Sequence, residues 1–131
     1  MPHVITVCDE TVPGTKTKRF TLECLTERMT VREIIRARIY QEVQDFNQRK
    51  QEVFHGLVQP SDAERTLNGY RLKKPRRLDW ESQLKAAVEA FDRNGFIVLV
   101  GDRQADSLDQ EFVVAADSEV TFLRLLPMVG G

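Results

Sequence analysis

Several kinds of segment are missing from this sequence, and each absence excludes a class of protein. No apolar run approaches the ~20 residues that cross a bilayer as a helix, and the run from Phe96 to Val100 is only strand-sized. The first ten residues have no basic start and no apolar core, so they do not form a secretory signal. Because 19 basic residues oppose 20 acidic ones, the field of a dedicated nucleic-acid or membrane-surface binder is absent. We therefore expect a cytoplasmic protein with no nucleic-acid or membrane partner.

Cysteine and histidine are scarce, with two residues each. Cys8 and Cys24 fall in the two strands of one expected hairpin, which places Cys8 opposite a residue near Phe20. Cys24 is then about four residues, or roughly 13 Å, from the position that a bridge needs, beyond the ~7 Å limit of a disulfide. We expect two reduced thiols that act as small apolar side chains. No metal-ligand spacing, phosphate loop or activated nucleophile is recognisable, so we expect no metal site, no bound cofactor and no catalysis by the chain itself.

The N-terminal part predicts a β-hairpin and then an amphipathic helix. Residues 4–8 and 19–25 are rich in strand-forming side chains, and Pro13-Gly14 between them supplies turn chemistry. Thr30 and Glu33 have the spacing of a capping box, which begins a helix expected to run to about Arg49. Its apolar stripe consists of Val31, Ile34, Ile35, Ile39, Val43 and Phe46.

The rest of the chain predicts an irregular segment, a second helix and further strands. Residues 50–78 show little periodicity, whereas Asp79 can cap a helix over 80–93 that ends at Asn94-Gly95. Strand-like runs occupy 96–100, 111–114 and 119–126. A hairpin, a helix and more strands predict an α+β fold, with a mixed sheet packed on one main helix, in a single domain of 131 residues.

The last strand-like run ends at Leu126 and is followed by Pro127, Met128, Val129, Gly130 and Gly131. The order of the expected elements is a hairpin, a helix, a strand, a glycine turn and a last strand, followed by a tail that ends in diglycine. This order resembles that of ubiquitin and its relatives. The passage from Phe96 to Ala105 is similar to the family's third strand and the glycine turn after it, and Thr30-Val31 is similar to the start of its helix. This resemblance implies the β-grasp fold.

The resemblance covers residues 1–49 and 96–131 and leaves a helical insertion at 50–95, before the third strand. A second departure is the tail, which lacks the arginine that ubiquitin carries shortly before its diglycine. A larger, divergent chain of this kind resembles the ubiquitin-like proteins of bacterial ubiquitination-like operons, some of which act in antiphage defence.

In that family the terminal glycine carboxylate is the reactive group. The resemblance implies that an activating enzyme uses ATP to adenylate Gly131, that a thioester follows, and that an isopeptide bond to a target amine results. Gly130 leaves room for close approach because it has no Cβ. The flexible tail at 127–131, with Leu126 before it, would contact the activating enzyme through Leu126, Pro127, Met128 and Val129. Expected partners are activating-like and conjugating-like enzymes, a deconjugating protease and the amines of target proteins.

Two other functions fit the same residues. A sulfur carrier uses an adenylated diglycine end to make a thiocarboxylate, although such carriers are usually shorter. A noncovalent interaction module with this fold would never have its diglycine activated.

Two surface features also have alternative interpretations. The basic cluster is either a docking patch for an acidic enzyme or a solvated loop. It consists of Arg71, Lys73, Lys74, Arg76 and Arg77. The run from Phe96 to Val100 is apolar on both faces, so one face either forms an exposed docking patch or is covered by the inserted helix. The apolar stripe of that helix includes Trp80, Leu84, Val88 and Phe91.

Overall fold

The computed structural model describes residues 3–11, 15–24, 26–49, 53–61, 63–66, 69–72, 77–114 and 118–125. These residues form an α+β structure with two helices, a five-stranded mixed sheet and two small sheets. The elements are β1 (His3–Thr11), β2 (Thr15–Cys24), β3 (Arg28–Thr30), α1 (Val31–Arg49), β4 (Val53–Phe54), β5 (Ala63–Arg65), β6 (Tyr70–Leu72), α2 (Trp80–Asp92), β7 (Phe96–Val100), β8 (Arg103–Gln104), β9 (Glu111–Val113) and β10 (Glu119–Arg124). Within the described ranges, neither helix has the length and apolar character that a membrane crossing requires.

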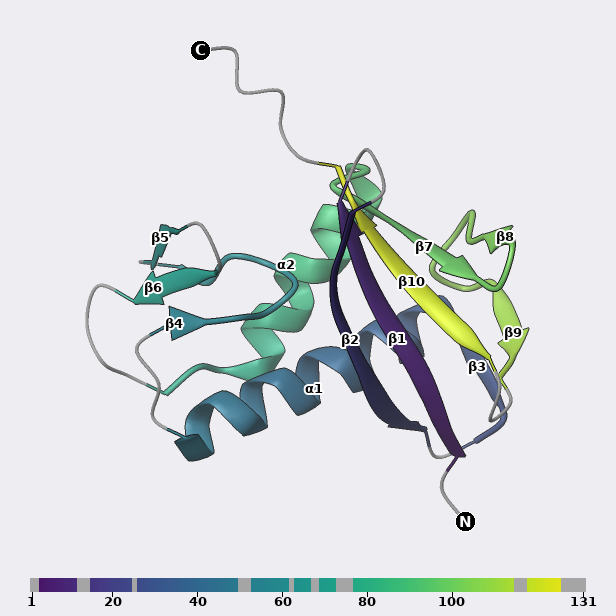
Figure 1. Cartoon of the computed structure of the whole chain (residues 1–131), viewed down its shortest axis with the longest axis horizontal. Coiled ribbons are helices and arrows are strands. Elements are labelled where there is room, and N and C mark those ends of the chain that lie inside the picture. The colour runs from purple at the N-terminus through teal and green to yellow at the C-terminus, as the bar shows by residue number, and fades with distance from the viewer. Residues whose placement is uncertain are drawn as a thin grey trace.

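The main sheet has the strand order β2-β1-β10-β7-β8 (Figure 1). Strand β1 pairs antiparallel with β2, which confirms the predicted hairpin, and parallel with β10. Cys8 lies opposite Arg19, one residue from the predicted partner, and Cys24 lies opposite His3. Both cysteines are buried and neither forms a disulfide, as expected.

Helix α1 packs its apolar stripe against the inner face of this sheet. All six predicted stripe residues are buried, and the helix spans Val31–Arg49 as predicted. The capping box is formed: Thr30 Oγ1 accepts from the Glu33 amide at 3.1 Å, and Glu33 Oε1 accepts from the Thr30 amide at 3.0 Å. The facing strands contribute Ile5, Val7, Leu22, Val98, Val120 and Phe122.

The segment between α1 and β7 contains a three-stranded sheet, in the order β4-β6-β5, and helix α2. The sequence predicted α2, which is capped as expected because Asp79 accepts from the Ser82 amide at 3.3 Å. The small sheet was not predicted, since its strands have only two or three residues each. Periodicity cannot be recognised in runs that short.

Helix α2 lies on the same side of the main sheet as α1. Trp80 meets Tyr40 of α1 edge-on at 5.3 Å, and Phe91 meets Phe96 at 5.9 Å between ring centroids. Phe96 belongs to the inner face, because it also contacts the fully buried Phe122. The interpretation in which α2 covers the second face of β7 is therefore wrong. That outer face carries Ile97 and Leu99, which stay partly exposed.

The last strand is shorter than predicted. Strand β10 ends at Arg124, which lies opposite Phe96 at the start of β7, whereas the sequence predicted a strand to residue 126. The predicted strand at 111–114 is found as β9, which pairs with β3 beside the start of α1.

Candidate functional site

The tail that the sequence singles out begins where the described part of the chain stops. Its predicted site residues lie outside the described residues, namely Leu126, Pro127, Met128, Val129, Gly130 and Gly131. The geometry of the site is therefore that of its root, Arg124 and Leu125. Figure 1 places this root at the end of the sheet away from the N-terminus, between β1 and β7.

Two hydrogen bonds connect the root to the segment 50–95. Arg124 Nη2 donates to the Gly56 carbonyl at 2.9 Å. The Leu125 amide donates to the Gly95 carbonyl at 3.2 Å, which extends the pairing of β10 with β7 by one residue. The two acceptors come from the start and the end of the inserted segment, so both ends of that segment contact the base of the tail.

A buried charge network lies directly behind Arg124. Its Nη2 is 3.7 Å from Asp9 Oδ2. The same carboxylate accepts from both terminal nitrogens of Arg38, at 2.5 and 2.7 Å, and Arg38 Nε donates to Glu42 at 2.5 Å. Two guanidinium groups thus meet two carboxylates, which is the pairing that buried charges require.

Arg38 is the centre of this network and is fully buried. Its guanidinium lies 4.5 Å from the ring centroid of Phe122 and 5.1 Å from that of Phe20. Burial by itself would lower the pKa of Arg38, but the Glu42 and Asp9 carboxylates outweigh that effect and raise it above the ordinary value. The side chain is therefore a permanent cation inside the core.

The loop that Arg124 contacts is fixed from the helix side as well. Glu42 Oε2 accepts from the Leu57 amide at 3.1 Å. Gly56 is buried, and a Cβ at this position would overlap the Phe54 ring and lie 2.8 Å from Glu42 Oε2. Only glycine lets the backbone pass here without displacing a neighbour. The Gly56 carbonyl is therefore held in place for Arg124.

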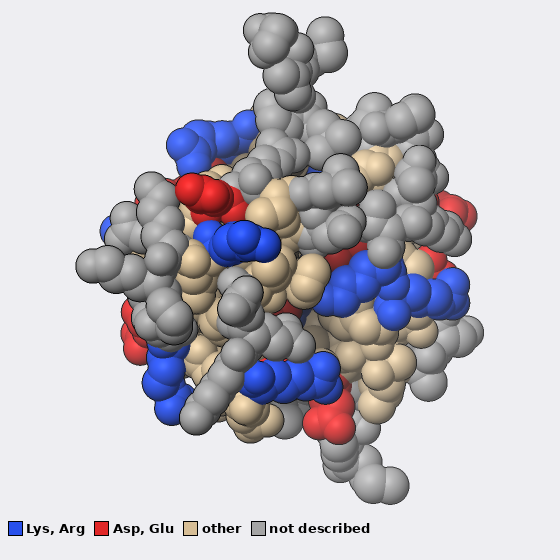
Figure 2. Space-filling model, turned by 60° about the vertical axis from the view of Figure 1, so that its left-hand side comes forward, with Lys and Arg blue, Asp and Glu red and all other residues tan. Residues whose placement is uncertain are grey.

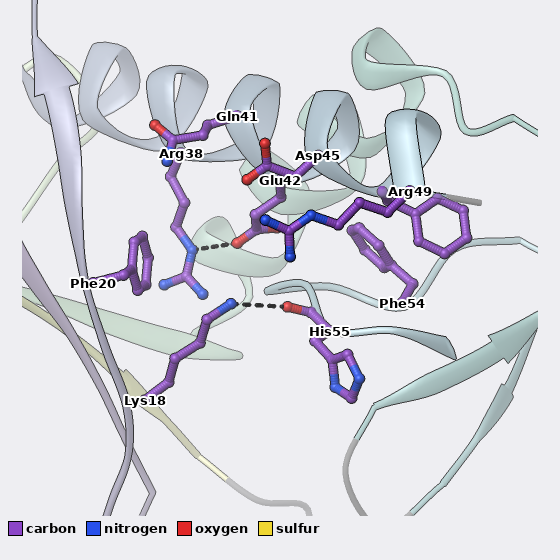
Figure 3. A pocket seen from close by; sticks show the side chains of 10 residues that line it. Lys18, Phe20, Arg38, Gln41, Glu42, Asp45, Arg49, Phe54 and His55 are labelled. Carbon is purple, nitrogen blue, oxygen red and sulfur yellow. Dashed lines mark hydrogen bonds and ion pairs between the residues drawn. The ribbon is translucent and has the colours of Figure 1, made fainter. Parts of the chain in front are cut away.

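A cleft of about 360 Å³ opens beside this network (Figure 3). It is lined by Lys18, Phe20, Arg38, Gln41, Glu42, Asp45, Phe46, Arg49, Phe54 and His55. Figure 3 shows Arg38 and Glu42 joined on α1, and Lys18 Nζ donating to the His55 carbonyl, at 3.3 Å. Charges of both signs line the cleft, so it has no strong preference for a ligand of one charge. Among the residues that the structure describes, no group of histidine, cysteine and acidic side chains could hold a metal ion.

The predicted basic cluster is only partly described. Arg71 lies in β6 and Arg77 precedes α2, and both are exposed, whereas Lys73, Lys74 and Arg76 lie outside the described residues. On the face that Figure 2 shows, the coloured Lys and Arg side chains form separate groups rather than one continuous patch. The docking patch stays a prediction.

Sequence reasoning missed Asp9, Arg38 and Arg124. One signal for Arg38 was available, because it lies on the apolar stripe of α1 between Ile35 and Ile39, and Glu42 follows four residues later. Comparison of the chain with protein families, with curated proteins and with solved structures finds no match.

Proposed function

We propose that this chain is a ubiquitin-like β-grasp protein that becomes attached through Gly131 to amines of target proteins. The observation that carries the proposal is the position of β10. A central strand, parallel to β1 and antiparallel to β7, leads directly into a sequence that ends in Gly130-Gly131. The sheet contains a hairpin and packs on a helix, and its last strand lies beside its first. This arrangement supports the β-grasp assignment.

The proposed chemistry takes place at a carboxylate that needs activation. With a terminal pKa of roughly 3.5, the Gly131 carboxyl group is ionised at neutral pH and is a poor electrophile. In the proposed sequence, a carboxylate oxygen attacks the α-phosphorus of ATP and releases pyrophosphate. An enzyme thiolate then displaces AMP to give a thioester, and a target amine displaces the thiolate to give an amide. The activating and conjugating enzymes supply the ATP site and the thiols.

The tail has the length and composition for this role. Six residues, from 126 to 131, can span at most roughly 20 Å when fully extended, which is enough to enter a narrow catalytic channel. Gly130 and Gly131 offer no Cβ at the reacting end, while Pro127 restricts the backbone next to the root. We propose a bacterial conjugation pathway, active in the cytoplasm and linked to antiphage defence, as its setting.

Deletion of Gly131 tests the proposal in the native host. Trypsin cleaves after Arg124, so a modified lysine should carry the branched remnant Leu-Leu-Pro-Met-Val-Gly-Gly. We expect mass spectrometry to find this remnant with the full chain and to lose it with the deletion. Lys85→Arg, at an exposed position of α2, is the control and should leave the branched remnant present.

Two results would overturn the proposal. Host activity that survives loss of Gly131 would favour a noncovalent module. A free chain in which one carboxylate oxygen is replaced by sulfur, without any branched remnant, would favour a sulfur carrier.

A further inference from the structure

We propose that the segment 50–95 clamps the root of the tail, and that Arg124 is the positioning residue of this clamp. The inference deepens the proposed function and rests on it in one respect, because the tail is taken to be the part that enters the activating enzyme. An enzyme that receives the tail then has to accommodate the segment 50–95 as well, since that segment sets where the tail leaves the domain.

The root of the tail is held through both its side chain and its backbone. Arg124 is the last residue of β10, where a strand ordinarily frays. Its guanidinium is held by the Gly56 carbonyl at 2.9 Å and lies 3.7 Å from the Asp9 carboxylate. The Leu125 amide, one residue further along, is held by the Gly95 carbonyl. Side chain and backbone together therefore fix the point from which the tail departs.

The loop that Arg124 contacts is itself fixed in place. The Gly56 carbonyl belongs to a loop that Glu42 fixes through the Leu57 amide, and Glu42 is itself bound by the buried Arg38. Arg38 and Arg124 share the Asp9 carboxylate. The loop and the root are thus connected to one buried network, so displacement of the loop displaces the acceptor of Arg124.

An unfavourable feature of Arg124 indicates that its role is more than packing. Its Nε is buried and has no hydrogen-bond acceptor among the described residues. An unpaired buried donor destabilises the folded state, and an apolar side chain at this position would avoid that cost. What the arginine gains in return is the contacts of its Nη2, which reaches both the Gly56 carbonyl of the loop and the buried Asp9 carboxylate.

Two variants test the clamp, one in the root of the tail and one in the loop that the root contacts. Arg124→Lys keeps the charge beside Asp9 but is shorter and has no planar group to span to Gly56. Gly56→Ala leaves Arg124 intact and displaces the loop, because its Cβ would overlap Phe54. Both variants still yield the same tryptic remnant. Arg93→Lys makes the same chemical change at an exposed residue near Gly95 and serves as the matched control.

The conformational readout is hydrogen exchange of the Leu125 amide, compared with the Val120 amide in the same strand. We expect the Leu125 amide to be protected in the wild type and to exchange about tenfold faster in both clamp variants, with Val120 unchanged. Wild-type exchange of Leu125 at the rate of an unfolded peptide overturns the clamp without any variant. Variants that fold and leave Leu125 unaffected overturn it as well.

The functional readout is the amount of branched remnant per folded chain. We expect both clamp variants to reduce it by about tenfold or more, because a displaced tail reaches the reacting geometry less often. Arg93→Lys should leave it unchanged. Faster exchange with an unchanged remnant overturns the positioning role of Arg124. Absence of the remnant in the wild type instead refutes the proposed function, and the exchange data then still decide whether the clamp exists.

Discussion

The main sheet and the segment 50–95 share one apolar core with α1, but the segment is also tied to this helix by hydrogen bonds to its backbone. The main sheet and α1 meet through a continuous apolar stripe, from Val31 to Phe46 on the helix. The segment adds buried apolar side chains such as Phe54 and Leu57, but its backbone is also fixed by polar side chains of α1. Asn47 bonds both the amide and the carbonyl of Leu78, at 2.8 and 3.0 Å.

Hydrogen bonds to backbone groups give the segment a position on α1 that apolar contacts alone would not specify. Apolar burial is non-directional and tolerates sliding, whereas hydrogen bonds to backbone groups specify position and orientation. The segment is fixed by Asn47 at one point and by Glu42 at another, both on the same helix. Its loop therefore has a defined position beside the root of the tail.

Removal of Arg38 should have the largest effect on stability, because this residue contacts both the main sheet and the side chain that fixes the loop of the segment. Arg38→Ala leaves Asp9 and Glu42 buried without their main cation. We expect the free energy of unfolding to fall by about 3–5 kcal/mol, measured by urea denaturation. Arg36→Ala, on the exposed side of the same helix, is the control and should cost far less. A loss for Arg38→Ala as small as that of the control would contradict a structural role for the network.

The same truncation of a buried leucine should have different effects in the two regions. Leu22 of β2 and Leu57 of the segment are both buried, at 1% and 4% exposed. Leu22→Ala should lower the global free energy of unfolding by about 2–5 kcal/mol and speed exchange throughout β1 and β10. Leu57→Ala should act chiefly on β4 and β6. Equal acceleration of the β1 amides by both variants would show one cooperative unit and remove the distinction.

Local signals account for the parts of the fold that the sequence predicts well. The start of helix α1 and its approximate end were predicted correctly, because Thr30, Glu33 and the apolar stripe lie within one segment. The hairpin and α2 follow for the same reason. Strands of two or three residues carry no usable period, so the small sheet β4-β6-β5 could not be predicted.

The candidate site shows the limit of sequence reasoning more sharply. Arg38 meets Asp9 across 29 residues, and Arg124 meets Gly56 across 68. These pairs depend on the strand order and on how the loop packs, so no local pattern of residues predicts which side chains meet. The diglycine tail was predicted from residue types alone, and its role stays a prediction.

Loss of Asn47 should loosen the segment without affecting the main sheet. Asn47→Ala leaves the buried Leu78 backbone without two hydrogen bonds, which should cost about 1–3 kcal/mol. We expect the change as faster hydrogen exchange in α2, with the amides of β1 unaffected. Gln48→Ala, at the exposed neighbouring position, is the control. Unchanged exchange in α2 would mean that apolar packing alone holds the segment.

The cap of α2 should give the smallest effect, with a distinct pH dependence. The hydrogen bond from the Ser82 hydroxyl to Asp79, at 2.7 Å, is the main cause that lowers the pKa of this carboxyl group below its ordinary value. Because the folded-state pKa is the lower one, the stabilisation is present above the unfolded pKa of about 3.9 and disappears as the pH falls through the folded value. Thermal unfolding of Asp79→Ala should therefore differ from the wild type at neutral pH and converge with it in acid. Asp79→Asn keeps an acceptor that does not titrate, so its difference from Asp79→Ala should stay constant with pH. A wild-type advantage over Asp79→Ala that persists undiminished in acid would show that the ionised carboxylate is not what stabilises the start of α2.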